Sequence, residues 1–254
     1  MDVNTILPPN RIYPEKNLLT LNRFCIPKHI AIIMDGNRRW AMLHGLLPMA
    51  GHFQGAETLL QIVRAASELG VEVLTVYAFS TENWKRTPEE VEALMKLFKT
   101  YIVKQENLML EEGVRLDVIG DMSKLPHDVR KTLDDAIETT KGGERFNLVL
   151  ALNYGGRDEL KRAVSAIVED CLSKKLSKEE ITEELIASYL DTSRWKDPDL
   201  LIRTSGESRL SNFLLWQISY SEVYMTDVLW PDFSEKNLLE AILEYQKKNL
   251  RIGS

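Results

Sequence analysis

Residues 30–40 read Ile30-Ala31-Ile32-Ile33-Met34-Asp35-Gly36-Asn37-Arg38-Arg39-Trp40, so an apolar run ends abruptly in a charged loop. Five apolar and partly β-branched residues have the length and composition of a buried strand. Further runs of this kind lie at 71–79, 114–119, 146–152 and 200–202, and helix-like stretches lie at 53–69, 88–112, 124–141, 157–172 and 178–190. This alternation predicts an α/β fold with a mostly parallel central β-sheet flanked by helices.

The 254 residues are enough for one large domain with a sizeable core. The first 25 residues carry Pro8, Pro9 and Pro14 among mixed polar residues, which is typical of irregular structure. We therefore expect an irregular amino-terminal leader over residues 1–25 and a single folded domain over residues 26–254.

Composition excludes several classes of protein. The net charge of −6 and the pI of about 5.4 argue against a nucleic-acid-binding surface. Two cysteines, Cys25 and Cys171, are too few for a cysteine-based metal site or a disulfide framework, and fit reduced thiols in a cytosolic protein. No apolar run approaches the roughly 18 to 20 residues that cross a bilayer, and the amino terminus lacks the features of a signal peptide. Cytoplasmic location is the expectation.

Polar residues follow four of the predicted strands at the point where each strand ends. Besides the loop at 35–40, these are Ser-Thr-Glu-Asn-Trp-Lys-Arg at 80–86, Asn-Tyr-Gly-Gly-Arg at 153–157 and Arg-Thr-Ser-Gly-Glu-Ser-Arg at 203–209. Ligands of open α/β sheets bind at the carboxyl ends of the strands. We therefore expect these four loops to form one polar site.

The chemistry of these loops suits phosphate. Guanidinium forks, small hydroxyls and glycine-exposed amides together bind oxyanions, and the arginines carry enough charge for two diphosphates. These arginines are Arg38, Arg39, Arg86, Arg203 and Arg209. Asp35 would repel phosphates unless a cation bridges them, and Mg²⁺ is the usual bridge. The alternative for Asp35 is a plain turn residue, since Asp-Gly is a common turn pair.

Other nucleotide- and metal-binding motifs are absent or weak. The sequence contains neither a P-loop nor a Rossmann glycine fingerprint, which argues against a nucleotide-phosphate hydrolase or kinase. The acidic run at 134–138 has the spacing of a solvated helix face. His52 follows Gly51 close to the first polar loop, so a hydrogen bond to a phosphate is plausible, although a lone histidine is more often structural. The apolar helix at 88–112 has the pattern of a core helix.

Taken together, these motifs resemble the cis-prenyltransferase (undecaprenyl diphosphate synthase) family from Ile26 to Gly253. The matching stretches occur in the family's order, at 30–40, 51–52, 77–86, 153–157, 199–207, 209–217 and 222–233. The resemblance implies a fold with a hydrophobic tunnel, and for a growing hydrocarbon part of the apolar face of helix 88–112 could line it. It also makes residues 26–254 a catalytic domain.

The resemblance assigns roles residue by residue. Asp35 resembles the aspartate that holds Mg²⁺ and helps the allylic diphosphate leave, and Glu222 the second carboxylate for the metal. The residues that match the cradle of that diphosphate are Gly36, Asn37, Arg38, Arg39, Trp40 and His52. A mobile segment over the site, with Asn83 as the proton acceptor, is matched by Ser80, Thr81, Glu82, Asn83, Trp84 and Arg86. The isopentenyl diphosphate site is matched by Arg203, Arg209, Leu210 and Ser211. Arg251 and Gly253 match a carboxyl-terminal signature that completes the partner's site in a homodimer.

Two positions depart from the family's pattern. Pro48 stands where bacterial relatives often have an arginine, so one diphosphate contact is missing or replaced. Arg38 stands where many relatives have glycine, a substitution that other members share and that adds compensating charge.

The implied reaction is the sequential cis-condensation of isopentenyl diphosphate with an allylic diphosphate, with farnesyl diphosphate as the expected primer. The expected product is undecaprenyl diphosphate for cell-wall lipid carriers, made by a cytoplasmic enzyme in transient contact with the inner face of the membrane. The alternatives are a product of another chain length and a non-catalytic subunit of the same fold. Such subunits tend to lose the aspartate and arginines that this chain keeps.

Overall fold

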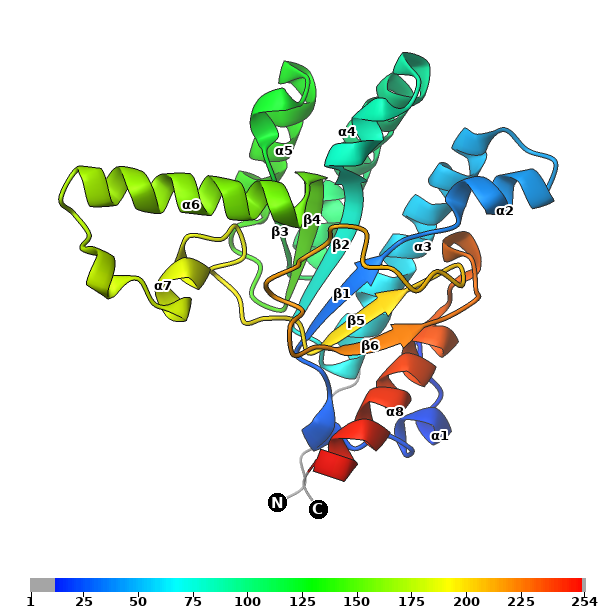
Figure 1. The fold of residues 1–254 in the computed structure, drawn as a ribbon. Helices are drawn as coiled ribbons and strands as arrows, with labels where there is room; N and C mark the ends of the chain where they lie inside the picture. The colour runs from blue at the N-terminus through cyan, green and yellow to red at the C-terminus, as the bar shows by residue number, and fades with distance from the viewer. Residues whose placement is uncertain (1–11, 253–254) are drawn as a thin grey trace.

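The structure, a computed structural model, describes residues 12–252 and is built around one six-stranded sheet (Figure 1). The strands are β1 (His29–Ile33), β2 (Val73–Ser80), β3 (Val114–Ile119), β4 (Phe146–Tyr154), β5 (Leu200–Arg203) and β6 (Glu222–Met225). Every pair of neighbouring strands is parallel, in the order β3-β4-β2-β1-β5-β6. The predicted parallel α/β sheet is therefore confirmed, and β1 lies between β2 and β5.

Helices connect the strands and cover the sheet. They are α1 (Glu15–Leu18), α2 (Asn37–Leu43), α3 (Pro48–Leu69), α4 (Pro88–Glu111), α5 (His127–Thr140), α6 (Gly156–Leu172), α7 (Glu183–Ser188) and α8 (Glu235–Ile252). Alternate residues of β1 divide the core. Ile30 and Ile32 join a large cluster with residues of α3, α4, α5 and α8, whereas Ala31 and Ile33 join a smaller one around Phe213. No helix in the part that the structure describes is long and apolar enough to cross a membrane.

All five predicted strands are present, with bounds within two residues of those expected. The predicted helix at 53–69 begins earlier, because Pro48 occupies the first turn, where a proline costs no hydrogen bond. The predicted helix at 178–190 is instead a 3₁₀ turn at Lys178–Glu180 followed by the short α7. Strand β6 and helices α2 and α8 were not predicted. None of the four residues of β6 is buried, so they give no strong apolar run.

Part of the predicted leader belongs to the folded core. Tyr13 is buried, and its hydroxyl donates to the carbonyl oxygen of Glu235 at 2.9 Å. The amide of Ile12 donates to the Glu68 carboxylate at 2.8 Å. These bonds tie residues 12–13 to α3 and α8, so they support the sheet from the side of the large cluster.

Candidate active site

Asp35 follows β1 and pairs with a buried arginine from β5. Its Oδ2 accepts from Arg203 Nη2 at 2.7 Å, and the side chains are 33% and 3% exposed. The next residue, Gly36, has φ of +106°, and an added Cβ would lie 2.9 Å from Leu229 Cδ2. Glycine is therefore required here both by conformation and by space. Its amide donates to Asp35 Oδ1 at 2.7 Å, which fixes the carboxylate at the edge of the sheet.

Arg203 links this carboxylate to the loop that follows β5. Its Nη1 donates to Ser211 Oγ at 2.7 Å and to the carbonyl oxygen of Arg209. A buried guanidinium needs such partners, because its desolvation is costly. Three of the four predicted residues for isopentenyl diphosphate are therefore connected, because Arg203 contacts Asp35, Arg209 and Ser211.

Three carboxylates hold the five arginines of the site. Asp35 forms an ion pair with Arg203. Glu90 pairs with Arg86 at 2.7 Å and with Arg38 at 3.5 Å. Glu207 pairs with Arg39 at 3.6 Å and also with Arg209. Arg39 also donates to the carbonyl and hydroxyl oxygens of Ser205, at 3.1 and 3.0 Å. Five guanidinium groups against three carboxylates leave a local charge of +2 in a protein whose net charge is −6. The site therefore attracts anions although the whole chain is acidic.

Unused hydrogen-bonding capacity is concentrated at the same place. Among the described residues, four buried side-chain atoms have no partner: Asn37 Oδ1, His52 Nε2, Arg203 Nε and Gln217 Oε1. The first three belong to residues predicted to bind diphosphate. Buried polar atoms without partners are rare in folded proteins, and a ligand is one common reason for them.

His52 is an uncharged hydrogen-bonding group at neutral pH. Burial lowers its pKa most, and together with the guanidinium groups of Arg86 and Arg38, against the opposing charge of Glu90, it brings the pKa to about 4. A neutral imidazole offers one donor and one acceptor. His52 is therefore suited to hydrogen bonding rather than to charge pairing in the unliganded protein.

The segment after β2 is a capped 3₁₀ turn, η2 (Thr81–Lys85). The Asn83 side-chain oxygen accepts from the Ser80 amide at 3.0 Å, and Trp84 Nε1 donates to Asn153 Oδ1 at 2.7 Å. Glu82 accepts from Thr81 Oγ1 at 3.1 Å and from Asn212 Nδ2 at 3.0 Å. These hydrogen bonds fix the conformation of the segment and attach it to Asn153 and Asn212. The role of Asn83 as proton acceptor stays a prediction.

Asn212 joins the loops that follow three strands. Besides its bond to Glu82, its Oδ1 accepts from the Arg157 amide at 2.9 Å, and its carbonyl oxygen accepts from the Gly156 amide at 2.7 Å. Its φ is +65°, and φ of Ser211 and Leu214 is also positive. Strained backbone of this kind persists only where surrounding contacts enforce it, and it is common at functional sites.

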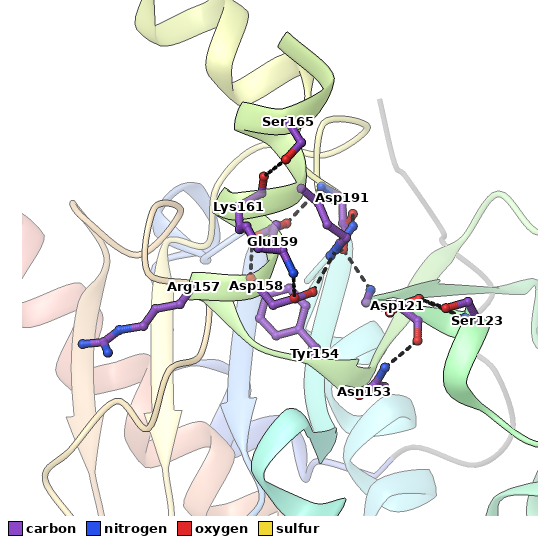
Figure 2. Close-up of polar contacts among 12 residues, drawn as sticks. Asp121, Ser123, Asn153, Tyr154, Arg157, Asp158, Glu159, Lys161, Ser165 and Asp191 are labelled. Atoms are coloured by element: carbon purple, nitrogen blue, oxygen red, sulfur yellow. Dashed lines mark hydrogen bonds and ion pairs between the residues drawn. The ribbon is translucent and has the colours of Figure 1, made fainter. Parts of the chain in front are cut away.

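A buried carboxyl supports these loops from below. Figure 2 shows Glu159 meeting the Tyr154 hydroxyl beneath the first turn of α6, with Arg157 pointing away from them. Glu159 Oε2 accepts from that hydroxyl at 2.5 Å and from Gln217 Nε2 at 3.0 Å. Burial raises the pKa of the Glu159 carboxyl. The contact with Gln217 anchors the far end of the loop that carries Ser211.

Two predicted site residues, Trp40 and Glu222, have side-chain partners outside the arginine cluster. Trp40 points its Nε1 at Asp232 Oδ1, 2.7 Å away, and its ring lies against His44. Glu222 pairs with Leu200 at the start of β5, whereas Asp35 binds Arg203 at its end.

Within one chain these positions set Asp35 and Glu222 at opposite ends of β5. Three steps along a strand are about 10 Å, whereas Mg²⁺ ligands lie about 2.1 Å from the ion. Glu222 is instead paired with Lys248 at 2.9 Å. That Glu222 contributes a second carboxylate to the metal stays a prediction. Arg251 lies in α8, but its side chain and the whole of Gly253 fall outside the described residues.

An apolar cavity adjoins the polar edge. Its volume is about 130 Å³, and it lies between α3, α4 and the sheet. Its lining includes Leu94, Leu97, Phe98 and Ile102 of α4, as expected for the apolar helix at 88–112. Asn37 and His52 also line it. The two atoms without partners, Asn37 Oδ1 and His52 Nε2, thus belong to residues that border both the arginines and the cavity.

A family model described as "Putative undecaprenyl diphosphate synthase" matches residues 33–253, which include nearly all of the site. The chain belongs to this family of cis-prenyltransferases. It is an isoprenyl transferase of the cis-polyprenyl diphosphate synthase type, as the motifs predicted.

Similar proteins cover almost the same span. The isoprenyl transferase of Chlamydia trachomatis is 51% identical over 90% of this chain and 92% of its own, and that of Geobacillus kaustophilus is 49% identical over 91% and 90%. Lavandulyl diphosphate synthase from Lavandula x intermedia, solved with dimethylallyl diphosphate, superposes with a TM-score of 0.86 at 34% identity, over 88% of this chain and 96% of that one. A Campylobacter jejuni protein described as "a probable undecaprenyl diphosphate synthase" gives 0.73 at 34% identity, over 87% and 95%. The parallel sheet and its flanking helices are therefore those of this family.

Sequence reasoning did not select several residues that hold the site. Glu90 had only the pattern of a helix first turn, and Glu207, Ser205 and Thr204 were seen only as parts of the loop after β5. Thr204 Oγ1 donates to the carbonyl oxygen of Asp35 at 2.7 Å and accepts from its amide at 2.9 Å. A carboxylate placed among phosphate-binding arginines was the one sequence signal for these residues. It applied to Glu90 and Glu207 as much as to Asp35.

Proposed function

We propose that the protein is a Mg²⁺-dependent synthase that adds isopentenyl diphosphate units to farnesyl diphosphate and makes undecaprenyl diphosphate. The observation that carries this proposal is the junction at Asn37 and His52, where an arginine-rich edge of net charge +2 meets an apolar cavity. An allylic diphosphate has the same division, with a charged head and a hydrocarbon tail. The junction suits this one molecule better than a nucleotide, which carries polar groups at both ends.

The residues at Asp35 fit Mg²⁺ held together with substrate. Mg²⁺ in phosphate-transfer sites is bound by one or two carboxylates, with phosphate oxygens and water completing the shell. Among the described residues, no three His, Cys, Asp or Glu side chains form a dedicated metal site. Asp35 is a single, partly exposed carboxylate beside arginines that suit phosphate, so it would hold the ion. Bound there, Mg²⁺ neutralises charge on the departing diphosphate.

The chain's own residues divide the two diphosphates between them. Arg38, Arg39, Arg86 and His52 hold the allylic diphosphate, and Arg203, Arg209 and Ser211 hold that of isopentenyl diphosphate. The arginines stabilise the charge that develops as the allylic C1–O bond breaks and its electron pair leaves with the diphosphate. The double bond of the isopentenyl unit forms the new bond to C1.

The isopentenyl unit then loses a proton from C2. Asn83 is a neutral amide, and its oxygen already accepts the Ser80 amide, so it is a poor base. We assign the proton to an oxygen of the departing diphosphate, with Asn83 fixing the shape of the segment over the site. Electrons and protons then balance without a further reagent.

Product length requires the cavity to enlarge. A cavity of about 150 Å³ holds one benzene molecule, so the 130 Å³ found here has room for about one isoprene unit. A longer chain must part α4 from α3 or pass beyond them. A shorter or different product is the alternative, and it is distinguished by the length of the hydrocarbon that is made.

Dimerisation and location complete the proposal. In the described chain β6 is one of the two edge strands of the sheet, and its outer side has no neighbouring strand. Unpaired edges favour association with another chain, which agrees with a homodimer in which Arg251 and Gly253 reach the partner's site. We place the enzyme in the cytoplasm, in transient contact with the membrane that receives its product.

The test is turnover by the purified chain alone. With Mg²⁺, radiolabelled isopentenyl diphosphate and farnesyl diphosphate, chromatography should show a ladder that ends at the undecaprenyl length, and chelation of Mg²⁺ should abolish it. A shorter or longer final band would replace the product assignment. Absence of any product would favour a non-catalytic subunit, and release of phosphate from ATP would favour a nucleotide hydrolase.

A further inference from the structure

The loop between α2 and α3 presents an exposed apolar surface, which we call the α2–α3 tip. Its members and their exposed fractions are Met42 (72%), Leu43 (75%), Leu46 (47%), Leu47 (80%) and Phe53 (48%). Single exposed apolar side chains are common on soluble proteins, but a contiguous group of them marks an interaction site. Five within twelve residues is such a group.

The tip also lacks charge. From Gly36 to Ala56 there is no Asp, Glu or Lys, and the charged residues are Arg38 and Arg39 alone. A chain that is 28% charged would place about six charged side chains in these 21 residues. Both arginines face the active site, where they contact Glu90 and Glu207. The tip is therefore a neutral surface on an acidic protein.

The backbone holds these side chains outward. The Leu46 amide donates to the carbonyl oxygen of Ala41 at 2.8 Å, and the Gly45 amide to that of Met42 at 3.1 Å. At Gly51 an added Cβ would lie 1.9 Å from the Asn37 carbonyl oxygen, so α2 and α3 are in close contact. The tip is thus a built surface whose apolar side chains do not fold back on the protein.

We propose that the α2–α3 tip inserts into the surface of a lipid bilayer. Protein interfaces surround an apolar centre with a polar rim, and this stretch supplies almost no charged residues for one. Exposed Leu, Met and Phe suit the boundary between lipid headgroups and acyl chains, and the lack of acidic groups avoids repulsion by anionic lipids.

The position of the tip gives this contact a use. Helices α2 and α3 also supply Asn37 and His52, which border the cavity. The loop that touches lipid is therefore continuous with the residues proposed to hold the allylic diphosphate. This use rests on the proposed function, because only a polyprenyl product needs delivery to a membrane, whereas the binding itself does not depend on catalysis.

The test is sedimentation of the full chain, without substrates, with vesicles of phosphatidylcholine and phosphatidylglycerol. Leu43→Gln/Leu47→Gln should lower the partition coefficient roughly tenfold or more, since two leucines lose their burial in lipid. The matched control is Leu19→Gln/Phe24→Gln, whose side chains are 80% and 99% exposed. Leu19 directly follows α1 and Phe24 lies in the 3₁₀ turn at Arg23–Cys25. Figure 1 shows α1 beside α8 and well away from the tip. The control should bind vesicles as the unmodified chain does.

Equal vesicle binding by both double variants, or none by the unmodified chain, would overturn the proposal. A different outcome is self-association of the unmodified chain without vesicle binding. If Leu43→Gln/Leu47→Gln abolished that self-association, the tip would be a contact between copies of the chain. Turnover of short substrates kept in solution by detergent should be unchanged in both double variants. If the unmodified chain and the control variant bound vesicles but none of the three proteins turned over substrate, the proposed function alone would be refuted.

Discussion

The polar edge of the sheet and the apolar cavity beside it share Asn37 and His52, yet they are built in different ways. At the polar edge, Gly36 and Asn212 have positive φ, and three buried atoms lack hydrogen-bond partners. The cavity is lined largely by leucines and other apolar residues in regular helices and strands. Strain and unused hydrogen bonds mark places where a ligand completes the structure, whereas apolar linings tolerate exchange of similar side chains. Substitutions at the edge should therefore change turnover, and substitutions in the cavity should change the product.

The largest effect on turnover is expected for Asp35→Asn. The variant keeps the shape of the side chain but loses the charge that would hold Mg²⁺, so kcat should fall on the order of a thousandfold. Steady-state assays at saturating Mg²⁺ measure this effect. Asp117→Asn is the matched control. Asp117 lies on β3 and is also paired with arginines, namely Arg115 at 3.1 Å and Arg194 at 2.6 Å. That control should lower the melting temperature and leave kcat within a few-fold. A kcat for Asp35→Asn close to the unmodified value would remove the distinction between edge and cavity.

A smaller effect on turnover is expected at Asn212, which joins the loops after three strands. Asn212→Gly keeps the freedom to adopt φ of +65° but loses both side-chain bonds. Two lost hydrogen bonds should raise the KM for isopentenyl diphosphate about tenfold to a hundredfold. Asn212→Ala should be worse in stability, since alanine resists positive φ. If both variants kept a normal KM, Asn212 would be a structural residue only.

Leu97→Trp should change the product more than the rate. Leu97 is 5% exposed and lines the cavity, so a larger ring fills space that the growing chain needs. Product chromatography should show a shorter final polyprenyl chain, with the first condensation slowed only a few-fold. Overpacking should destabilise the fold by about 1–3 kcal/mol. An unchanged ladder of products would mean that the chain does not grow through this cavity.

His52 should give no titration in kcat/KM between about pH 6 and 8, because its pKa of about 4 leaves it neutral in the free enzyme there. Its effect is on stability. The unfolded chain protonates this histidine near pH 6.5, above the folded pKa of about 4, so stability should fall as pH falls through this window, by at most about 3 kcal/mol.

Denaturant unfolding of the unliganded protein at several pH values measures this dependence. The pKa of buried His29 is also lowered, so the comparison with His52→Asn isolates the contribution of His52. An equal loss of stability at low pH in the unmodified protein and in His52→Asn would contradict the lowered pKa of His52.

The sequence predicted those parts of the site that depend on neighbours in the chain. The run before Asp35 has the composition of a buried strand, and the loop after it has the chemistry of phosphate binding, so both were evident. The position of Glu222 at the start of β6 was not predicted, because it depends on the strand register, which apolar periodicity does not give. Glu90 and Glu207 were missed because their pairing with arginines joins segments far apart in sequence.

The most direct measurement is a crystal structure with Mg²⁺, isopentenyl diphosphate and an unreactive thio analogue of farnesyl diphosphate. We expect one diphosphate within hydrogen-bonding distance of Arg39 and His52, the other at Arg203 and Ser211, and the farnesyl tail beside Leu97. Diphosphates bound away from Asp35, or a tail on the outer surface of α3 and α4, would contradict this expectation.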